Sequence, residues 1–385
     1  MTSSSRPREG LVTVTPPAGA GAATPGDRLQ DLLIRGVEGL LRILPEWAAF
    51  GLGGGLGRVA GSVMRIRRKV VEENLRRAFP EREPSWIART ASASYAHIGR
   101  EGVALLRMGA LGPEEVRART RVEGMEHVEA PLAQGQGVIL LTGHLGNWEI
   151  GGAALAVRGI PMDVVARRQN NPLFDARLVR TRESLGMRVV ERDGSTKTLL
   201  RSLRTGRVVA LVADQNVLSG GVFVEFFGTL ASTARGPELL AERTGAAVVF
   251  ATAIRRPGRT ARYDVEISPL LPAAGGATPD SATPPGDTQG LLRHYLAALE
   301  KSIRGAPSQY LWAHKRWKTR PPAEPPPPEV PDRGRKELRF PGTVPQHETR
   351  NTDDDSRDDS RRGTLDQDLP GPGTPPGTSR QGDHP

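Results

Sequence analysis

The sequence contains no cysteine, few aromatic residues and no long uninterrupted apolar run. The absence of cysteine among its 385 residues excludes disulfides, thiolate metal sites and a covalent cysteine intermediate. Aromatic residues make up only 4% of the chain and do not alternate with basic ones, so the sequence offers no stacking platform for nucleic acid. We therefore expect no nucleic-acid partner.

Several common catalytic motifs are also absent. The chain has no GxSxG nucleophile elbow, no GxxxxGK[ST] phosphate loop and no HExxH zinc motif. These absences disfavour a serine hydrolase, a P-loop nucleotidase and a zinc hydrolase of the HExxH type. We therefore expect neither a metal ion nor a bound cofactor.

Neither end of the chain is rich enough in apolar residues to form a core. Residues 1–27 are rich in Ser, Pro, Gly and Ala, and residues 321–385 are mostly Pro, Gly, Asp, Arg, Ser and Thr. Such segments cannot bury enough apolar surface to offset the entropy that ordering costs. We expect two disordered extensions around a folded body, which consists of a membrane-associated helical region at 28–80 and an α/β domain at 81–320.

An apolar segment at residues 32–64 is the candidate for membrane contact. Its longest uncharged run, residues 47–57, is shorter than the ~20 residues that a helix needs to cross a bilayer. We expect a helix that lies in the membrane interface or a short helical hairpin that enters one leaflet, with a true span as the alternative. Gly53, Gly57 and Gly61 recur every four residues and predict a small face for close helix packing.

The excess of basic residues points to an anionic partner. The net charge is +10, and a basic stretch at residues 64–81 directly follows the apolar segment. We expect this stretch to form a collar that faces anionic lipid headgroups. An ordinary solvated helix face would have the same pattern and is the alternative.

From about residue 120 the chain alternates short apolar runs with amphipathic stretches, which is the pattern of an α/β domain. We expect a central, mostly parallel or mixed sheet flanked by helices. The expected strands lie at residues 137–144, 162–168, 187–192, 207–216, 246–255 and 262–268. The expected helices lie at residues 150–159, 175–186, 196–206, 236–246 and 288–307.

In such open sheets the chemistry collects at the carboxyl ends of the strands. His144 closes the first expected strand, Arg167 lies at the end of the second, and Asp214 and Gln215 lie at the end of the fourth. We expect these side chains to converge on one site.

The stretch HLGNWE at residues 144–149 carries the pattern that most needs a chemical explanation. A neutral imidazole at His144 can accept a proton from a hydroxyl, and a carboxylate on its other nitrogen would fix the tautomer. Asn147 is suited to cap the next helix and would place Glu149 in its first turn. We expect His144 to act as a general base that Glu149 orients; the alternative is that both residues are structural.

This stretch resembles the HX4E variant of the HX4D/E signature found in the glycerolipid acyltransferase superfamily. Together with four further blocks it resembles the bacterial lipid A biosynthesis acyltransferases, the lauroyl and myristoyl transferase group, over roughly residues 35–321. The further blocks are RRKVVEENLRRAFPE at 67–81, ARRQNNPLFD at 166–175, ADQN at 213–216 with FFGTLASTARGPELLAERTGA at 226–246, and APSQYLWAHKRWKTRPP at 306–322.

The resemblance implies a reaction, its substrates and a location. It implies transfer of a fatty acyl group from a thioester, acyl carrier protein or else coenzyme A, to a hydroxyl of a phosphorylated lipid A precursor. The location would be the cytoplasmic face of the cell inner membrane, and no cofactor would be needed. Two alternatives stay open, which are acylation of another glycolipid or lysophospholipid and a non-catalytic, membrane-associated lipid-binding protein.

The resemblance also implies roles for single residues. Arg167 would contact the acceptor phosphate or the developing oxyanion, and Asp214 and Gln215 would shape the substrate pocket or hold the turn beside it. Arg316, in the closing block, would have a structural or headgroup-contact role. Asn147 is counted with these as a substrate-binding residue.

Overall fold

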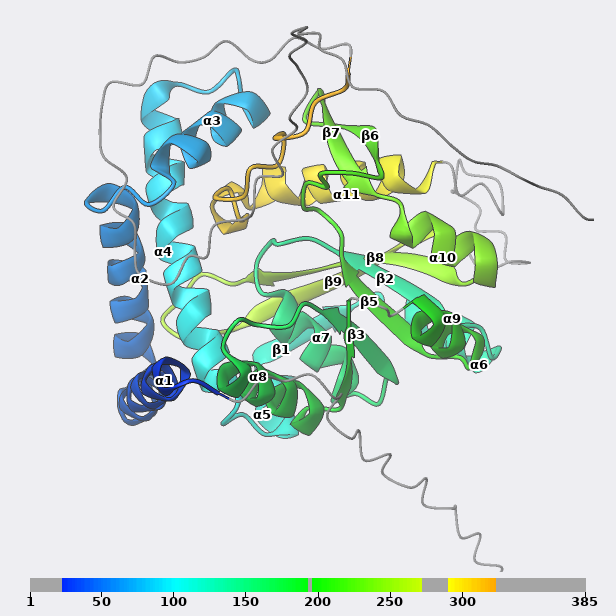
Figure 1. The fold of residues 1–385 in the computed structure, drawn as a ribbon, viewed down its shortest axis with the longest axis horizontal. Helices are drawn as coiled ribbons and strands as arrows, with labels where there is room; N and C mark the ends of the chain where they lie inside the picture. Colours follow the sequence, from blue (N-terminus) through cyan, green and yellow to red (C-terminus); the bar gives the residue numbers. More distant parts are fainter. Residues whose placement is uncertain (1–22, 193–195, 272–289, 323–385) are drawn as a thin grey trace, which may run out of the picture. The chain divides into compact units, whose positions relative to one another are not determined.

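Figure 1 shows the fold as a computed structural model, which describes residues 23–192, 196–271 and 290–322. Most of the predicted N-terminal extension lies outside the described residues, and a helix already begins at Pro25. The predicted C-terminal extension lies outside them from residue 323 onward.

A seven-stranded sheet forms the centre of the fold, with the strand order β1-β9-β8-β2-β5-β3-β4. Every neighbouring pair is parallel except β8 and β9, which are antiparallel. This arrangement confirms the predicted α/β class with a mostly parallel sheet. The strands are β1 Thr120–Glu123, β2 Val138–Thr142, β3 Met162–Ala166, β4 Met187–Glu191, β5 Val208–Val212, β8 Ala247–Arg255 and β9 Tyr263–Leu271.

The central strand β2 is apolar along its whole length because helices cover both faces of the sheet. Ile139 and Leu141 belong to the core on one face, and Val138 and Leu140 belong to the core on the other. Each full burial of such a side chain stabilises the fold by about 1.5–3 kcal/mol. The strand therefore gives a rigid base for the residues that follow it.

Two helical layers enclose the sheet (Figure 1). The core on one face includes side chains of α9, α10 and α11, and the core on the other includes side chains of α5, α6 and α7. The helices of these layers, together with α8, are α5 Pro113–Arg119, α6 Glu126–Ala133, α7 Trp148–Ala156, α8 Pro172–Ser184, α9 Thr196–Arg204, α10 Gly236–Thr244 and α11 Leu291–Gly305.

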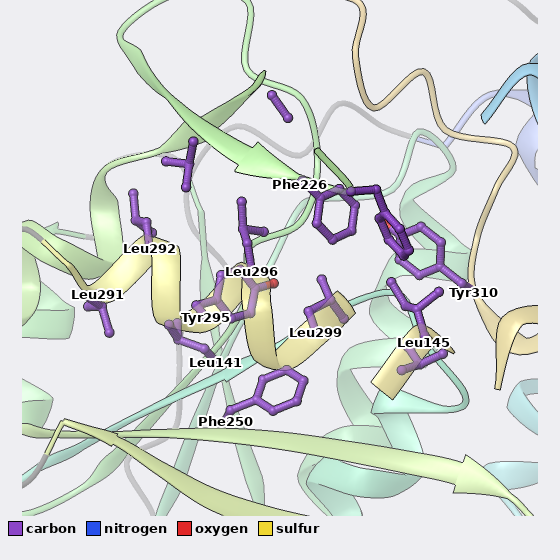
Figure 2. Packing of buried hydrophobic residues seen from close by; sticks show 14 of the residues in the cluster. Leu141, Leu145, Phe226, Phe250, Leu291, Leu292, Tyr295, Leu296, Leu299 and Tyr310 are labelled. Carbon is purple, nitrogen blue, oxygen red and sulfur yellow. The ribbon is translucent and has the colours of Figure 1, made fainter. Parts of the chain in front are cut away.

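Helix α11 supports the carboxyl end of β2 from one side. Figure 2 shows its Tyr295 and Leu299 beside Leu141 and Phe250 of the sheet. The rings of Phe250 and Tyr295 lie 6.0 Å apart, edge to face. The Tyr295 hydroxyl donates a hydrogen bond to the carbonyl of Thr142, the last residue of β2, at 2.8 Å. This contact satisfies a buried carbonyl and fixes the point at which the chain leaves the sheet.

From residue 23 onward, four helices precede the α/β domain, and the second packs on the fourth through its glycines. A Cβ atom at Gly57 would lie 2.0 Å from the carbonyl oxygen of Tyr95, and one at Gly61 would lie 2.2 Å from the Tyr95 ring. A Cβ at Gly53 would lie 2.7 Å from the Gly99 carbonyl. The predicted small face is therefore confirmed. The four helices are α1 Pro25–Ile43, α2 Glu46–Ser62, α3 Arg68–Ala78 and α4 Pro84–Met108.

Helix α1 turns two acidic side chains toward the protein and most of its apolar ones outward. Asp31 and Glu38 both pair with Arg177 of α8, the latter at 2.8 Å. The outward apolar side chains continue onto α2, and we call them the apolar surface of α1 and α2. Its members, all exposed, are Leu29, Leu32, Leu33, Val37, Leu40, Ile43, Trp47, Leu52, Leu56 and Val59. Among the described residues, no helix combines the length and the apolar character that a bilayer span requires.

A two-stranded antiparallel hairpin, β6 (Gly221–Phe226) and β7 (Thr229–Ala234), follows the site-forming strand β5 and was not predicted. No element was expected between the strand at 207–216 and the helix at 236–246. Arg316, from the segment after α11, donates to the carbonyl of Ser232 and to the hydroxyl of Thr233, both at 2.7 Å. The closing segment of the fold is thereby tied to this hairpin.

Candidate active site

The register of β2 and β5 brings two polar residues together. Thr142 pairs with Val212 at the carboxyl ends of these parallel strands, and His144 and Asp214 each follow two residues later. Nδ1 of His144 lies 2.6 Å from Oδ1 of Asp214, and the backbone N–H of His144 donates to Oδ2 at 2.9 Å. Two hydrogen bonds thus fix the imidazole against one carboxylate.

The charges of this pair reinforce each other. Burial by itself would lower the pKa of His144, but the carboxylate of Asp214 outweighs burial and raises it. Burial would raise the pKa of Asp214, which is 2% exposed, but the charge and hydrogen bonds of His144 hold it below its ordinary range. Asp214 is therefore ionised. Nδ1 of His144 carries a proton and donates it in the hydrogen bond to Oδ1 of Asp214.

The other imidazole nitrogen, Nε2, is left with a lone pair. It lies 3.2 Å from Nε2 of Gln215, whose amide can donate to it. Trp148 meets the ring edge-on, with ring centroids 4.7 Å apart. The imidazole is thus held on three sides, and its basic nitrogen lies on the cleft described below.

The turn between His144 and α7 has a backbone that only glycine fits. Gly146 has a φ of +64°, and a Cβ atom there would lie 2.0 Å from the Ala253 carbonyl oxygen. Asn147 caps α7 as predicted, because its Oδ1 accepts from the backbone N–H of Ile150 at 2.9 Å. Glu149 consequently lies in the first turn of the helix, also as predicted.

Glu149 does not bind His144, so the predicted hydrogen-bond partner was wrong. Its two oxygens accept a forked pair of bonds from Arg182 of α8, at 2.9 Å from Nε and 2.6 Å from Nη2. The planar guanidinium matches the carboxylate, and both side chains are mostly buried. The charge of Glu149 still acts on His144, where it is a smaller cause of the raised pKa than Asp214.

A cleft of about 460 Å³ opens at the carboxyl ends of the strands, and His144 lies on its wall. The polar lining residues are His144, Glu149, Arg167, Gln169, Arg182, Arg192 and Gln215. The apolar lining includes Leu140, Leu155, Val164, Met187, Ala210, Ala251 and Val265, which come from the sheet and from α7 and its surroundings. One cavity therefore joins a charged region to an apolar one.

The structure brings some of the predicted substrate-binding residues to the cleft and places others elsewhere. Arg167 and Gln215 line the cleft and are exposed. Asn147 does not line it, and its side-chain amide is engaged by Ile150 and, at 2.6 Å, by Glu101. Arg316 does not line it either; it is 1% exposed and bound to the β6–β7 hairpin.

Two residues near the site make contacts that were not predicted from the sequence. Arg182 lies within the helix expected at residues 175–186, but nothing in the sequence indicates which face of that helix meets Glu149. His314 accepts the backbone N–H of Asn216 on its Nε2 at 2.9 Å and so holds the turn after Asp214. Burial lowers the pKa of His314, which keeps that nitrogen available as an acceptor.

Metal ligation has no support in the part of the chain that the structure describes. There, no three or more His, Cys, Asp or Glu side chains gather in a way that could hold a metal ion.

The chain resembles proteins of one family along most of its length. A family model described as bacterial lipid A biosynthesis acyltransferase matches residues 28–319. The lipid A biosynthesis lauroyltransferase of Escherichia coli (strain K12) is 30% identical over 289 residues, which cover 74% of this chain and 90% of that protein. The lipid A biosynthesis myristoyltransferase of the same organism is 27% identical over 270 residues, covering 70% and 80%.

A relative named for a different acceptor has a similar sequence identity. The phosphatidylinositol mannoside acyltransferase of Mycolicibacterium smegmatis is 31% identical over 233 residues, which cover 58% of this chain and 74% of that protein. The similarity to these relatives thus extends over proteins that act on different glycolipids.

Proposed function

This chain belongs to the bacterial lipid A biosynthesis acyltransferase family and is an enzyme that transfers acyl groups, and from that premise we propose its reaction. It moves a fatty acyl chain from an acyl thioester to a hydroxyl of a lipid A precursor, with His144 as the general base. The observation that carries this proposal is the imidazole of His144, fixed by Asp214 at 2.6 Å on the wall of the cleft.

The proposed mechanism uses one proton transfer in each direction. Nε2 of His144 removes the proton of the acceptor hydroxyl as its oxygen attacks the thioester carbonyl carbon. The tetrahedral intermediate collapses, the carbon–sulfur bond breaks, and the imidazolium returns the proton to the departing thiolate. Asp214 stabilises the positive charge that His144 carries between these steps. The products are an ester and a free thiol, with no covalent acyl-enzyme.

The two parts of the cleft suit the two parts of such a substrate pair. A cavity of about 460 Å³ is within the range that holds small organic ligands. We assign the fatty chain to the apolar region between the sheet and α7, where Leu140, Leu155 and Val265 lie. The charged region beside His144 then receives the hydroxyl and its anionic headgroup.

Cations near the imidazole favour an anionic acceptor. Arg167 is exposed on the cleft, and we propose that it contacts a phosphate of the acceptor or the developing oxyanion. Arg182 is oriented by Glu149 and lies on the same wall. We propose that this ion pair keeps a cation and a carboxylate fixed near His144, so that neither has to reorganise during the reaction.

The donor and the membrane both carry negative charge, and the chain carries +10. We propose acyl carrier protein, which is acidic, as the usual donor, with coenzyme A as the alternative. The enzyme needs no cofactor in this scheme. Neither choice changes the chemistry at His144, since both donors present the same thioester.

We propose that the apolar surface of α1 and α2 lies in the inner membrane interface, at its cytoplasmic face. Ile43 is 85% exposed and Leu32 66% exposed, while the charged residue Asp31 of the same helix is 5% exposed. Exposing apolar side chains to water while burying charges is unfavourable unless the apolar side meets lipid. Arg65 and Arg67, just beyond α2, are exposed and suited to anionic headgroups.

A related glycolipid is the second candidate acceptor. The Mycolicibacterium relative, which is named for a phosphatidylinositol mannoside, is as similar in identity as the lauroyltransferase. The residues that carry out the attack would be the same in both cases, because they contact the hydroxyl and the thioester alone. The acceptor therefore has to be identified by experiment.

Mass spectrometry of the glycolipids from a strain that lacks this protein tests the proposal. We expect lipid A to lose one acyl chain, and we expect the wild-type gene, but not a His144→Ala version, to restore it. Unchanged lipid A with one acyl chain missing from another glycolipid would support the second acceptor. Unchanged glycolipids of both kinds would contradict the proposed function.

A further inference from the structure

Behind the catalytic turn, on the side away from the main cleft, one carboxylate collects several buried donors. Glu101 of α4 accepts from the side-chain amide of Asn147 at 2.6 Å and from the hydroxyl of Tyr263 at 2.8 Å. Nη1 of Arg255 donates to its other oxygen at 3.2 Å. His97, one turn earlier on α4, lies 3.7 Å from the same oxygen.

This cluster is buried and carries balanced charge. The side chain of Glu101 is 12% exposed and that of Arg255 is 7% exposed. The Arg255 guanidinium also lies over the ring of Phe50, 4.4 Å from its centroid. A buried carboxylate without partners would be costly, and here each oxygen has at least one donor.

The cluster holds the backbone that leads from His144 into α7. Oδ1 of Asn147 caps the helix at Ile150 while its Nδ2 binds Glu101, so both ends of one amide are engaged. The His97 ring lies 3.3 Å from the carbonyl of Gly146. Glu101 itself does not line the main cleft. It lines a smaller pocket of about 210 Å³ that His144 also lines, but both of its oxygens are engaged by protein donors, which ties it to the turn rather than to a substrate.

We propose that Glu101 is a positioning residue of the acyl transfer, acting through the side-chain amide of Asn147 on the turn that carries His144. The inference rests on the proposed function for its kinetic part. It assigns to Glu101 the task of keeping Nε2 of His144 within reach of the acceptor hydroxyl. A displacement of about 1 Å at a reacting group can reduce the rate ~100-fold.

The chemistry of the contact suggests a sharp test. Glu101→Gln removes the negative charge and replaces one acceptor oxygen by an NH2 group, so the amide either meets the Nδ2 donor of Asn147 with a donor or accepts from it only in a weaker, uncharged bond. In the double variant Glu101→Gln, Asn147→Asp the bond can form again with its direction reversed. The introduced aspartate still caps α7, because aspartate is as good a cap as asparagine. The double variant also keeps the number of negative charges in the cluster.

We expect Glu101→Gln to lower kcat about 10–100-fold with little change in the KM of either substrate, and the double variant to recover most of that loss. Glu46→Gln is the matched control. Glu46 is also a partly buried carboxylate, which accepts from Arg119 at 2.7 Å and from the backbone of Ala261 at 2.6 Å, neither of which belongs to the turn. It should lose stability without losing kcat.

Amide hydrogen exchange of the purified protein provides a readout that does not depend on activity. We expect faster exchange at Asn147, Ile150 and Gly151 in Glu101→Gln, and wild-type exchange in the double variant. Wild-type kcat and exchange in the single variant, or no recovery in a folded double variant, would overturn the proposal. If the exchange changes as expected but the wild-type enzyme transfers no acyl group, the proposed function fails while the positioning of the turn stands.

Discussion

The carboxyl end of the sheet and the apolar surface of α1 and α2 differ in what surrounds their paired charges. At the sheet, charged groups such as His144 and Asp214, which are 2.6 Å apart, are paired beside a cleft. On α1 the charged Asp31 and Glu38 also face inward, toward Arg177, but apolar side chains cover the outside. The first arrangement suits a reaction, and the second suits a lipid surface.

This difference predicts that the two regions can be damaged separately. A change at the sheet should abolish chemistry on every substrate. A change on the apolar surface of α1 and α2 should matter only where a membrane is present. The predictions that follow use this separation, beginning with the largest expected effect.

Asp214→Asn should lower kcat about 10²–10⁴-fold, on vesicles and in detergent alike. The asparagine can neither fix the His144 tautomer reliably nor stabilise the imidazolium. Asp163→Asn is the matched control, since Asp163 is fully buried and binds Arg207 at 2.6 Å, at the opposite end of β3. That variant should be less stable in thermal unfolding but should keep its kcat; equal losses of kcat in both would refute a special role for Asp214.

Replacing Leu32, Leu33 and Val37 together by serine should weaken binding to vesicles of phosphatidylethanolamine and phosphatidylglycerol at least tenfold. The three side chains are 66%, 62% and 48% exposed, so their loss removes apolar area from the membrane contact but little from the core. Sedimentation with vesicles measures the binding, and a soluble short-chain thioester measures the chemistry. Leu218→Ser, at a leucine 64% exposed elsewhere, is the control. Undiminished vesicle binding of the triple variant would contradict the membrane role of this surface.

Gly152→Val should shift the acyl preference toward shorter chains by a few-fold in kcat/KM. Gly152 lines the cleft, and a Cβ atom there would lie 3.1 Å from Sδ of Met187. The added side chain would shorten the apolar region without touching His144. Rates with a series of acyl thioesters measure the shift. An unaltered chain-length profile would show that the fatty chain lies elsewhere.

The smallest effect concerns the pH dependence. Because the pKa of His144 is raised, its neutral form should be lost, and with it kcat, as the pH falls through a value above that of ordinary histidine. Glu149→Gln should move this acid limb to lower pH, since the charge of Glu149 is one of the causes of the raised pKa. The shift should be smaller than in Asp214→Asn. A pH–rate profile of the three proteins tests the order.

The sequence predicted the strands of the site and the convergence of the residues at their ends, but not that Asp214, rather than Glu149, binds His144. The strands at 137–144 and 207–216 were expected, and parallel pairing of neighbouring strands brings the residues after them together. His144 and Asp214 meet for that reason. The predicted cap at Asn147 followed from local chemistry, since a side-chain oxygen there can reach the third residue of the helix.

The remaining contacts depend on tertiary packing that no local pattern records. His144 was the predicted partner of Glu149. Its actual partner is Arg182, 33 residues away in the sequence, and this contact depends on how α8 docks. The burial of Arg316 likewise depends on the β6–β7 hairpin, which was not predicted from the sequence. The contacts that long side chains make between distant elements could not be predicted from the sequence.

The central claim is that the imidazole of His144 removes the proton from the acceptor hydroxyl. Its most direct test is the rate of acyl transfer by purified His144→Ala protein, with folding verified by circular dichroism. The predicted result is a loss of about 10²–10⁴-fold in kcat at saturating donor and acceptor. Transfer at the wild-type rate by the folded variant would contradict the claim.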